Sequence, residues 1–286
     1  MNQKILNLVK TGTLIVLMVL SFSGVIGQNS MPITKIDSQT SRKGEIVWID
    51  LLTNDAKASK KFFKDLLGWS FKNYGDYELA LSGTKPVAGI MEDQELLKGS
   101  KTSYWVVSAS VNDVDESINK IKSKGGKVLS DPMEISGRGT VALVQDAQGA
   151  FFSILHNSAG DPKASAPRNG QWMWAELWTD NPEAAVSFYT DVLAITAKPL
   201  SDNEEGDYFI LKGDTYEFGG ITETPVKNED PIWIPVLRVA NAETLAKKAV
   251  DLGGSILINP VEVSGKKVAL VATPSGAPFL IQEWKK

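Results

Sequence analysis

Two carboxylates stand in the same local setting at widely separated points of the chain. Asp50 follows Trp48 by two residues, Glu176 follows Trp174 by two residues, and the second pair comes 126 positions after the first. Residues two apart on a β-strand face the same side, so each acid would share an apolar face with an indole ring. Burial of this kind raises the pKa of a carboxyl group and can make it a general base. Asp50 and Glu176 are therefore candidate catalytic residues; alternatively, each acid only hydrogen-bonds a neighbouring strand or an arginine at a domain seam.

The segment around Asp50 predicts one strand that feeds one helix. Residues 46–53 alternate in side-chain type, and residues 56–67 place Phe63 and other apolar side chains on one helix face with lysines opposite. Gly68 then ends the helix. The same signals return at residues 171–194, where Tyr189 takes the place of Phe63, again 126 positions later. A fixed spacing with matched chemistry indicates an internal repeat.

Each strand and helix is followed by three short strands, which gives a β-α-β-β-β module. Four such modules begin near residues 46, 104, 173 and 232. We expect an α+β fold in which the four βαβββ modules pair into two domains, residues 44–156 and 171–286. The intervening residues 157–170, NSAGDPKASAPRNG, are rich in Pro, Gly, Ser and Ala and are predicted to form a linker.

The composition excludes several classes of site. The chain has 286 residues, 43% of them hydrophobic and 22% charged, as in ordinary globular proteins. Its net charge of −4 argues against a nucleic-acid partner. The absence of cysteine excludes disulfides and thiolate chemistry, and the single histidine excludes sites with several imidazoles. That histidine, His156, is expected at the surface beside the linker.

The N-terminal residues 1–27 have the layout of a secretory signal peptide. Lys4 and Lys10 precede an uncharged stretch that contains TLIVLMVL, and small residues precede Gln28. The apolar run is shorter than the ~20 residues that a spanning helix prefers; the alternative is an uncleaved anchor. Residues 28–43 are predicted to be a flexible leader. We therefore expect an exported protein, periplasmic or extracellular, with no stable membrane anchor after cleavage.

The repeated segments resemble the vicinal oxygen chelate superfamily, which includes glyoxalase I, the bleomycin-resistance proteins and the extradiol dioxygenases. The resemblance covers about residues 44–284, and the segments are most similar to tandem-domain glyoxalase-like proteins. It rests on the openings WIDLLTNDAKASKKFFKDLLGW and WAELWTDNPEAAVSFYTDVLAI, the VAGIM and FGGIT strands, VNDVDESINKIKSKGGKV, and the closings VQDAQGAFFSIL and VATPSGAPFLIQ. It implies that each pair of modules forms an incomplete barrel around a cleft.

The resemblance also implies where metal-dependent members place His, Glu or Gln ligands. The four positions fall on Trp48, Val106, Ser153 and either Met91 or Glu92 in the first domain, and on Trp174, Ile234, Leu280 and either Thr222 or Glu223 in the second. A divalent metal needs several nitrogen or carboxylate donors at one point. No metal site and no cofactor are therefore predicted, with a divalent metal left open.

Other side chains are expected to face the clefts. They are Trp48, Tyr104, Ser108 and Ser153 in the first domain, and Trp174, Trp178, Arg238 and Gln282 in the second. The tryptophans either stack on a flat ligand or only fill the cleft. Arg138, in the turn before a cleft strand, either meets an anionic ligand or stays solvated, as does its counterpart Lys266.

These observations favour an exported tandem-domain protein that binds a small organic molecule in its cleft without the family's metal. Two alternatives stay open: a metal-dependent lyase, isomerase or dioxygenase, and a metal-free enzyme with Asp50 or Glu176 as the base. Because two domains in one chain can satisfy the module pairing internally, a monomer is expected.

Overall fold

The computed structural model describes residues 40–92, 102–135, 137–200, 208–226 and 229–284. The strands of the first sheet are β1 (Ile46–Thr53), β2 (Ser70–Asn73), β3 (Tyr77–Ser82), β4 (Lys85–Glu92), β5 (Tyr104–Ser110), β6 (Lys127–Val128), β7 (Met133–Ile135), β8 (Gly139–Gln145) and β9 (Phe151–His156). Those of the second sheet are β10 (Gln171–Thr179), β11 (Thr196–Pro199), β12 (Tyr208–Lys212), β13 (Glu217–Glu223), β14 (Ile232–Val239), β15 (Ser255–Val263), β16 (Lys266–Ala272) and β17 (Pro278–Glu283). The described helices are α1 (Ala56–Leu67), α2 (Val114–Ser123), α3 (Pro182–Leu193) and α4 (Ala242–Asp251).

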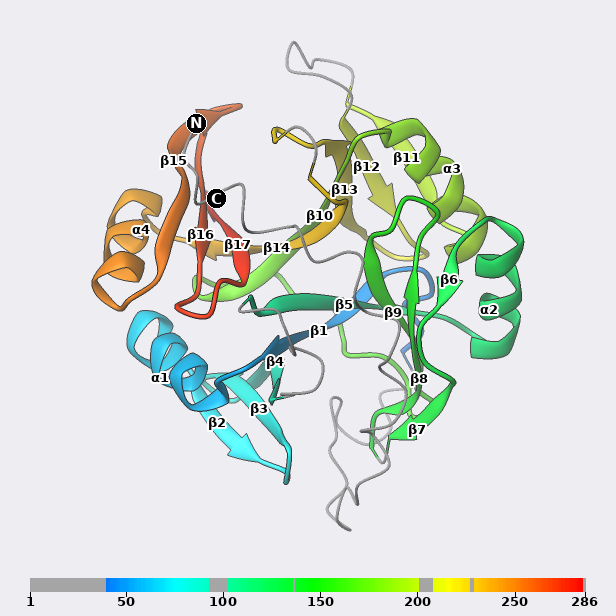
Figure 1. Ribbon diagram of the computed structural model, residues 1–286, viewed down its shortest axis with the longest axis horizontal. Helices are drawn as coiled ribbons and strands as arrows, with labels where there is room; N and C mark the ends of the chain where they lie inside the picture. Colours follow the sequence, from blue (N-terminus) through cyan, green and yellow to red (C-terminus); the bar gives the residue numbers. More distant parts are fainter. Residues whose placement is uncertain (1–39, 93–101, 136, 201–207, 227–228, 285–286) are drawn as a thin grey trace.

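The two sheets have the same topology. The first runs β2-β3-β4-β1-β5-β9-β8-β6, with β7 also paired to β8, and the second runs β11-β12-β13-β10-β14-β17-β16-β15. In each, the opening strand is parallel to the last strand of its own module and antiparallel to the opening strand of the next. Each sheet is a curled half-barrel (Figure 1). The predicted α+β fold of four paired βαβββ modules is confirmed.

Two strands differ from the sequence-based expectation. The short strand β7 was not expected, and β15 continues to Val263, past Pro260 and beyond residues 255–257, where the sequence predicts a strand. β15 is the last strand in its sheet, and its pairing with β16 shifts register twice, between Ile256 and Ile258 and again before Val261. An edge strand with bulges tolerates proline, because its outer N–H groups need no partner within the sheet.

The helices begin and end where local signals place them. Asp55, Asp113, Asn181 and Asn241 each cap a helix by accepting a hydrogen bond from the backbone N–H three residues later. Helix α1 ends at Gly68 in the left-handed region, with φ 72°. Helix α3 ends at the equivalent Ala194, with φ 53°. The repeat therefore keeps the backbone conformation but not the glycine that suits it.

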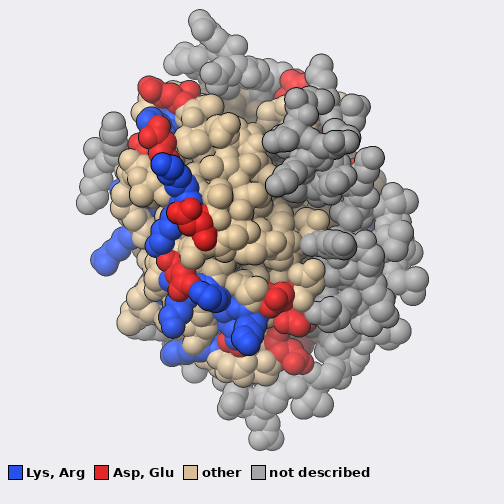
Figure 2. Space-filling view, turned by 60° about the vertical axis from the view of Figure 1, so that its left-hand side comes forward, with Lys and Arg blue, Asp and Glu red and all other residues tan. Residues whose placement is uncertain are grey.

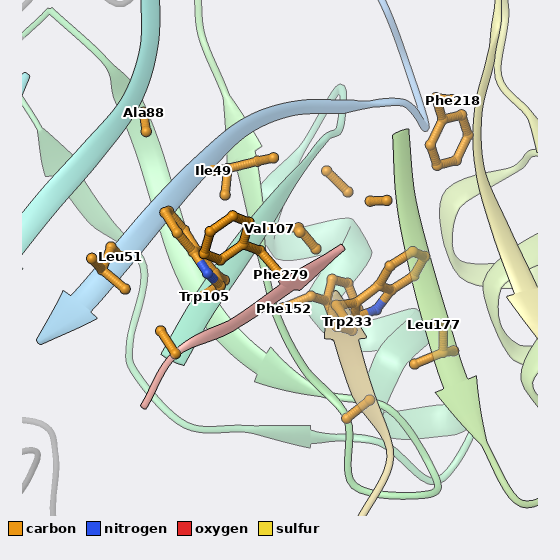
Figure 3. Packing of buried hydrophobic residues seen from close by; sticks show 14 of the residues in the cluster. Ile49, Leu51, Ala88, Trp105, Val107, Phe152, Leu177, Phe218, Trp233 and Phe279 are labelled. Atoms are coloured by element: carbon orange, nitrogen blue, oxygen red, sulfur yellow. The ribbon is translucent and has the colours of Figure 1, made fainter. Parts of the chain in front are cut away.

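The outer faces of the sheets and the helices form one hydrophobic core that both halves share. The ring centroid of Phe63 on α1 lies 5.9 Å from that of Phe279 on β17, and Phe152 on β9 lies 6.5 Å from Phe188 on α3. Helix α1 contacts α4, and α2 contacts α3, at opposite ends of the molecule (Figure 1). Figure 3 shows side chains from both sheets, including Phe152 and Phe279, gathered in this core. Separating the halves would expose it to water.

A buried glutamate ties the first sheet to the second. Glu45, just before β1, is fully buried, and its carboxylate accepts hydrogen bonds from the backbone N–H groups of Thr215 at 2.9 Å and Tyr216 at 3.0 Å, in the turn between β12 and β13. Arg42 Nε donates to the same carboxylate at 2.7 Å. Burial alone would raise the pKa of Glu45. The hydrogen bond from the Thr215 hydroxyl, the two backbone hydrogen bonds and the Arg42 charge outweigh it and lower the pKa.

A second polar bridge runs through Tyr189 on α3. Its hydroxyl donates to Asp146 Oδ2 at 3.1 Å, in the turn between β8 and β9, and accepts from Trp233 Nε1 at 2.9 Å. The repeat replaces Tyr189 by Phe63 in the first half. There the matching indole nitrogen, Trp105 Nε1, is buried with no hydrogen-bond partner among the described residues.

The predicted signal segment and most of the predicted leader, residues 1–39, lie outside the described residues. Residues 40–43 contact the linker: Arg42 N donates to Asp161 Oδ2 at 2.7 Å, and Asp161 N donates to Thr40 O at 2.7 Å. None of the described helices is long and apolar enough to cross a membrane.

Candidate functional site

Asp50 lies at the centre of a closed hydrogen-bond network on the concave side of the first sheet. We call this surface the first inner face and define it by Trp48, Asp50, Tyr77, Ser108 and Ser153. Asp50 Oδ1 accepts from Trp48 Nε1 at 2.9 Å and from the Tyr77 hydroxyl at 2.7 Å, and the Ser108 and Ser153 hydroxyls lie 2.6 Å apart. All five side chains are buried.

Arg138 completes this network from the turn between β7 and β8. Its Nη2 atom lies 2.5 Å from Asp50 Oδ2 and 3.1 Å from Ser108 Oγ, and its side chain is only 3% exposed. The sequence suggested either an anionic ligand or solvent as the environment of Arg138. The structure instead gives it a carboxylate of its own chain as its partner. The charge of Asp50 is therefore already paired within the chain.

Glu176 occupies the equivalent position on the concave side of the second sheet. We call this surface the second inner face and define it by Trp174, Glu176, Trp178, Tyr208 and Ile234. Glu176 Oε2 accepts from Trp178 Nε1 at 3.1 Å, Oε1 accepts from the Tyr208 hydroxyl at 3.3 Å, and that hydroxyl accepts from Trp174 Nε1 at 2.9 Å. Burial raises the pKa of Glu176, and the hydrogen bonds from Trp178 and Tyr208 offset this only in part.

The two inner faces differ in exposure and in charge balance. Asp50, Trp48 and Tyr77 are each at most 6% exposed, whereas Glu176 and the counterparts of the two aromatic residues are half-buried. Within the described part of the chain, no ion pair involves Glu176. Glu176 is therefore more exposed than Asp50 and, among the described residues, has no cationic partner.

The counterpart of Arg138 does not reach Glu176. Lys266 places its Nζ atom 3.6 Å from the ring centroid of Trp284, a cation–π contact. The two residues before it, Ser264 and Gly265, both have positive φ, 47° and 73°. This is typical of a tight two-residue hairpin turn, which keeps β15 and β16 paired up to Lys266.

The remaining predicted residues are dispersed. Tyr104 is half-buried, with its ring 6.4 Å from that of Phe151. Arg238 donates to Pro167 O at 2.9 Å and to Trp284 O at 3.2 Å, so it holds the linker and the end of the chain. Gln282 is half-buried and pairs with Arg238 in the sheet register. His156 is half-buried, with Nδ1 3.1 Å from Val111 O.

Sequence reasoning missed the two tyrosines that contact the carboxylates. Tyr77 and Tyr208 lie opposite glycine-containing strands, and each needs the glycine. A Cβ atom on Gly89 would lie 2.0 Å from the Tyr77 hydroxyl oxygen, and one on Gly220 would lie 2.2 Å from that of Tyr208. Both the tyrosine and the glycine recur 131 positions later, and this repeat was the available signal.

The donors at the family's ligand positions do not fit a divalent metal. Met91, not Glu92, faces the first inner face: Met91 packs with Trp48 and Tyr77, whereas Glu92 Oε2 accepts from Ala56 N at 2.9 Å at the start of α1. In the second sheet the position on the same face is Thr222, opposite Tyr208. No group of three or more His, Asp or Glu side chains in the described ranges could hold a metal ion.

A cavity of about 1020 Å³ opens between the sheets beneath the linker. It lies where β1 and β10 begin, and its lining includes Trp48, Trp174, Lys85, Phe218 and residues 162–167. Lys85 Nζ donates to Ser165 Oγ at 2.7 Å, which fixes the linker over the cavity. The cavity adjoins the first inner face at Trp48 and the second inner face at Trp174. Its volume is that of a site for a drug-sized molecule.

Comparison with known proteins agrees with the topology. Residues 45–154 match the model of the Glyoxalase/Bleomycin resistance protein/Dioxygenase superfamily. Residues 45–154 therefore belong to this superfamily. One relative aligns across both halves: the chain is 28% identical over 247 residues to the putative glyoxylase CFP32 of Mycobacterium bovis, covering 84% of this chain and 95% of that protein.

Two further comparisons span both halves. The chain is 27% identical over 268 residues to the anthracycline biosynthesis protein DnrV of Streptomyces peucetius, covering 85% of this chain and 94% of that one. The Mn(II)-bound glyoxalase from Novosphingobium aromaticivorans superposes with a TM-score of 0.61 at 17% identity, over 85% of this chain and 83% of that chain. At that identity, the structural likeness to a superfamily member shows the fold alone.

Proposed function

We propose that this superfamily member is an exported protein that binds a small organic molecule on its second inner face. The observation that carries the proposal is the difference between the two inner faces. The same carboxylate position is paired with Arg138 in the first sheet and, as the half-buried Glu176, has no cationic partner among the described residues in the second. A binding surface needs accessible apolar area and a few fixed polar groups, and the second inner face has both.

The side chains around Glu176 suit an organic ligand. Trp174 and Tyr208 are half-buried, so their rings can contact a bound molecule, and Ile234 and Val236 supply an apolar floor. Trp178 Nε1 and the Tyr208 hydroxyl hold the carboxylate in place. The cavity that adjoins Trp174 gives room for the rest of the ligand.

The ligand positions of the family support binding without a metal. Trp174, Ile234, Leu280 and Thr222 offer no nitrogen or carboxylate donor, and Glu176 alone does not hold a divalent ion. We accordingly assign no step to a metal. Export is supported by the signal-like N-terminus. On the face shown in Figure 2 the basic side chains are interspersed with acidic ones, which fits a small-molecule ligand better than a nucleic acid.

A ligand screen with matched variants tests this function. Metabolites that raise the thermal stability of the mature protein would be titrated into the parent protein and into the Tyr208→Phe variant, and their affinities compared. Tyr77→Phe is the control on the first inner face. We expect Tyr208→Phe to weaken binding and Tyr77→Phe to leave it unchanged, both before and after dialysis against a chelator. Hits that respond to Tyr77→Phe alone, or that vanish with the chelator, would contradict the proposal.

A second candidate function is a metal-free enzyme that uses Glu176 as a general base. It is favoured by the raised pKa of Glu176, which brings a carboxylate closer to the basicity that proton abstraction at neutral pH requires. If a bound molecule is also turned over, Glu176→Gln should abolish the turnover, whereas Asp50→Asn should keep it. Turnover that survives Glu176→Gln would exclude this role.

A further inference from the structure

The first inner face shows how this fold accommodates a cation. The Arg138 guanidinium enters from the turn before β8 and reaches a carboxylate that two neutral donors, Trp48 and Tyr77, already hold. Ser108 Oγ lies beside the same guanidinium nitrogen at 3.1 Å. The Arg138 side chain thus takes the place on the first inner face that a cationic ligand would take.

The second inner face keeps the carboxylate and its neutral donors, but no arginine or lysine among the described residues pairs with that carboxylate. Glu176 replaces Asp50, Tyr208 replaces Tyr77 as a donor to the carboxylate, and the second indole donor is Trp178. Trp174, the counterpart of Trp48, donates to the Tyr208 hydroxyl instead. Lys266, the counterpart of Arg138, is engaged by the Trp284 ring instead. No cation pairs with Glu176 within the described ranges, and the residue is half-buried.

We propose that the second inner face binds an organic cation, a guanidinium or primary ammonium group carried on an apolar body. The inference rests on the proposed binding function and specifies its ligand class. The cationic nitrogen would donate to Glu176, as Arg138 donates to Asp50, and the half-buried Trp174 and Tyr208 rings would attract it through their faces. Val236 stands where the first sheet has Ser108, so the site requires fewer hydrogen bonds and offers more apolar contact.

Charge decides between ligand classes at this site. A carboxylate among apolar and aromatic groups interacts more strongly with a charge than it would in water, because the local dielectric is low. An anion would be repelled by Glu176. A neutral ligand of the same shape would leave the carboxylate without the counter-charge that its counterpart receives in the first inner face.

The test compares isosteres that differ in charge. Butylguanidinium and its neutral isostere butylurea would be titrated into the mature protein by calorimetry and by NMR of the indole N–H resonances. We expect butylguanidinium to bind about tenfold or more tightly than butylurea. The Glu176→Gln variant, which keeps the side-chain size, should bind both about equally. Glu223→Gln, an exposed change on neighbouring β13, serves as the control and should keep the preference.

Removing Arg138 provides an internal reference. Arg138→Ala empties the first inner face, so butylguanidinium should then bind at two sites and restore part of the lost thermal stability, while butylurea should not. If Arg138→Ala does not fold, the comparison of Glu176→Gln with the parent protein, both of which retain Arg138, still decides the question.

Each outcome separates the ligand class from the function. A cation preference that disappears in Glu176→Gln and persists in Glu223→Gln supports the inference. Equal binding of both isosteres on the second inner face overturns the inference and leaves the proposed function standing. A cation preference that survives Glu176→Gln also overturns it. If neither these probes nor the wider metabolite screen gives any binding on the second inner face, both the inference and the proposed function fail.

Discussion

The buried ion pair between Arg138 and Asp50 gives the sharpest prediction about stability. The two side chains are only 3% and 7% exposed, so solvent screens their interaction little. Removing one partner of such a pair leaves an uncompensated buried charge, which costs about 3–5 kcal/mol. Arg138→Met keeps most of the alkyl volume and deletes the charge. We therefore expect it to lower the free energy of unfolding by about 3 kcal/mol, the lower end of that range.

Urea unfolding followed by tryptophan fluorescence measures this loss, because urea, unlike guanidinium, does not screen charges. A double-mutant cycle with Asp50→Leu should show the two changes to be strongly non-additive, with the double variant more stable than Arg138→Met alone. Lys267→Met is the control: Lys267 pairs with Glu243 at 2.7 Å, but both side chains are exposed, so no measurable change is expected. A loss below about 1 kcal/mol for Arg138→Met, or additive single changes, would refute the reasoning.

Three further outcomes follow from pairs of repeated positions and from the contacts between halves. Ala194→Gly should raise the free energy of unfolding by about 0.5–1 kcal/mol, and Gly68→Ala should lower it at least as much, because both positions have positive φ; chemical denaturation of both variants checks this. Tyr189→Phe should cost about 1–3 kcal/mol, since Trp233 Nε1 loses its buried acceptor, and an unchanged urea midpoint would contradict it. Burial raises the pKa of Glu45, but its hydrogen bonds lower the pKa by more, so the folded-state pKa lies below the unfolded one. The contribution of Glu45 to the stability of the fold is therefore complete above the unfolded pKa and is lost as pH falls through the folded pKa. Unfolding measured across the acid range should therefore show a flatter pH dependence for Glu45→Gln.

The modules could be predicted from the sequence because each depends on residues that are close together in the chain. Alternation, a capping Asp or Asn, an apolar helix face and a closing glycine all concern residues that are close in the chain, and the repeat doubled each signal. The register of the opening strands was also predictable: Trp105, Val107 and Ala109 pack in the shared core, as burial required. The strand predicted at residues 255–257 extends past Pro260 to Val263, because an edge strand tolerates proline and an edge position is a property of the whole sheet.

The candidate site was predictable only in part. Asp50 and Glu176 were found because two-residue spacing and the 126-residue repeat are visible in one dimension. The partner of each acid was not, because a long side chain in a turn can fold towards a sheet or away from it. Arg138 and Lys266 match in the alignment of the repeats, and only the three-dimensional turn geometry separates them. The contacts of Tyr77 and Tyr208 with the carboxylates were not predicted, because their strands lie two places from β1 and β10 in the sheet order.

The core that the two halves share has a consequence for how such a chain diverges after duplication. Phe63 of one half packs against Phe279 of the other, so neither copy can be lost while its sister is kept. A copy that no longer binds anything still serves the folding of the pair. The inner faces of the two copies can therefore diverge, as the Arg138–Asp50 ion pair of the first half and the unmatched Glu176 of the second show, while the core that joins them is kept.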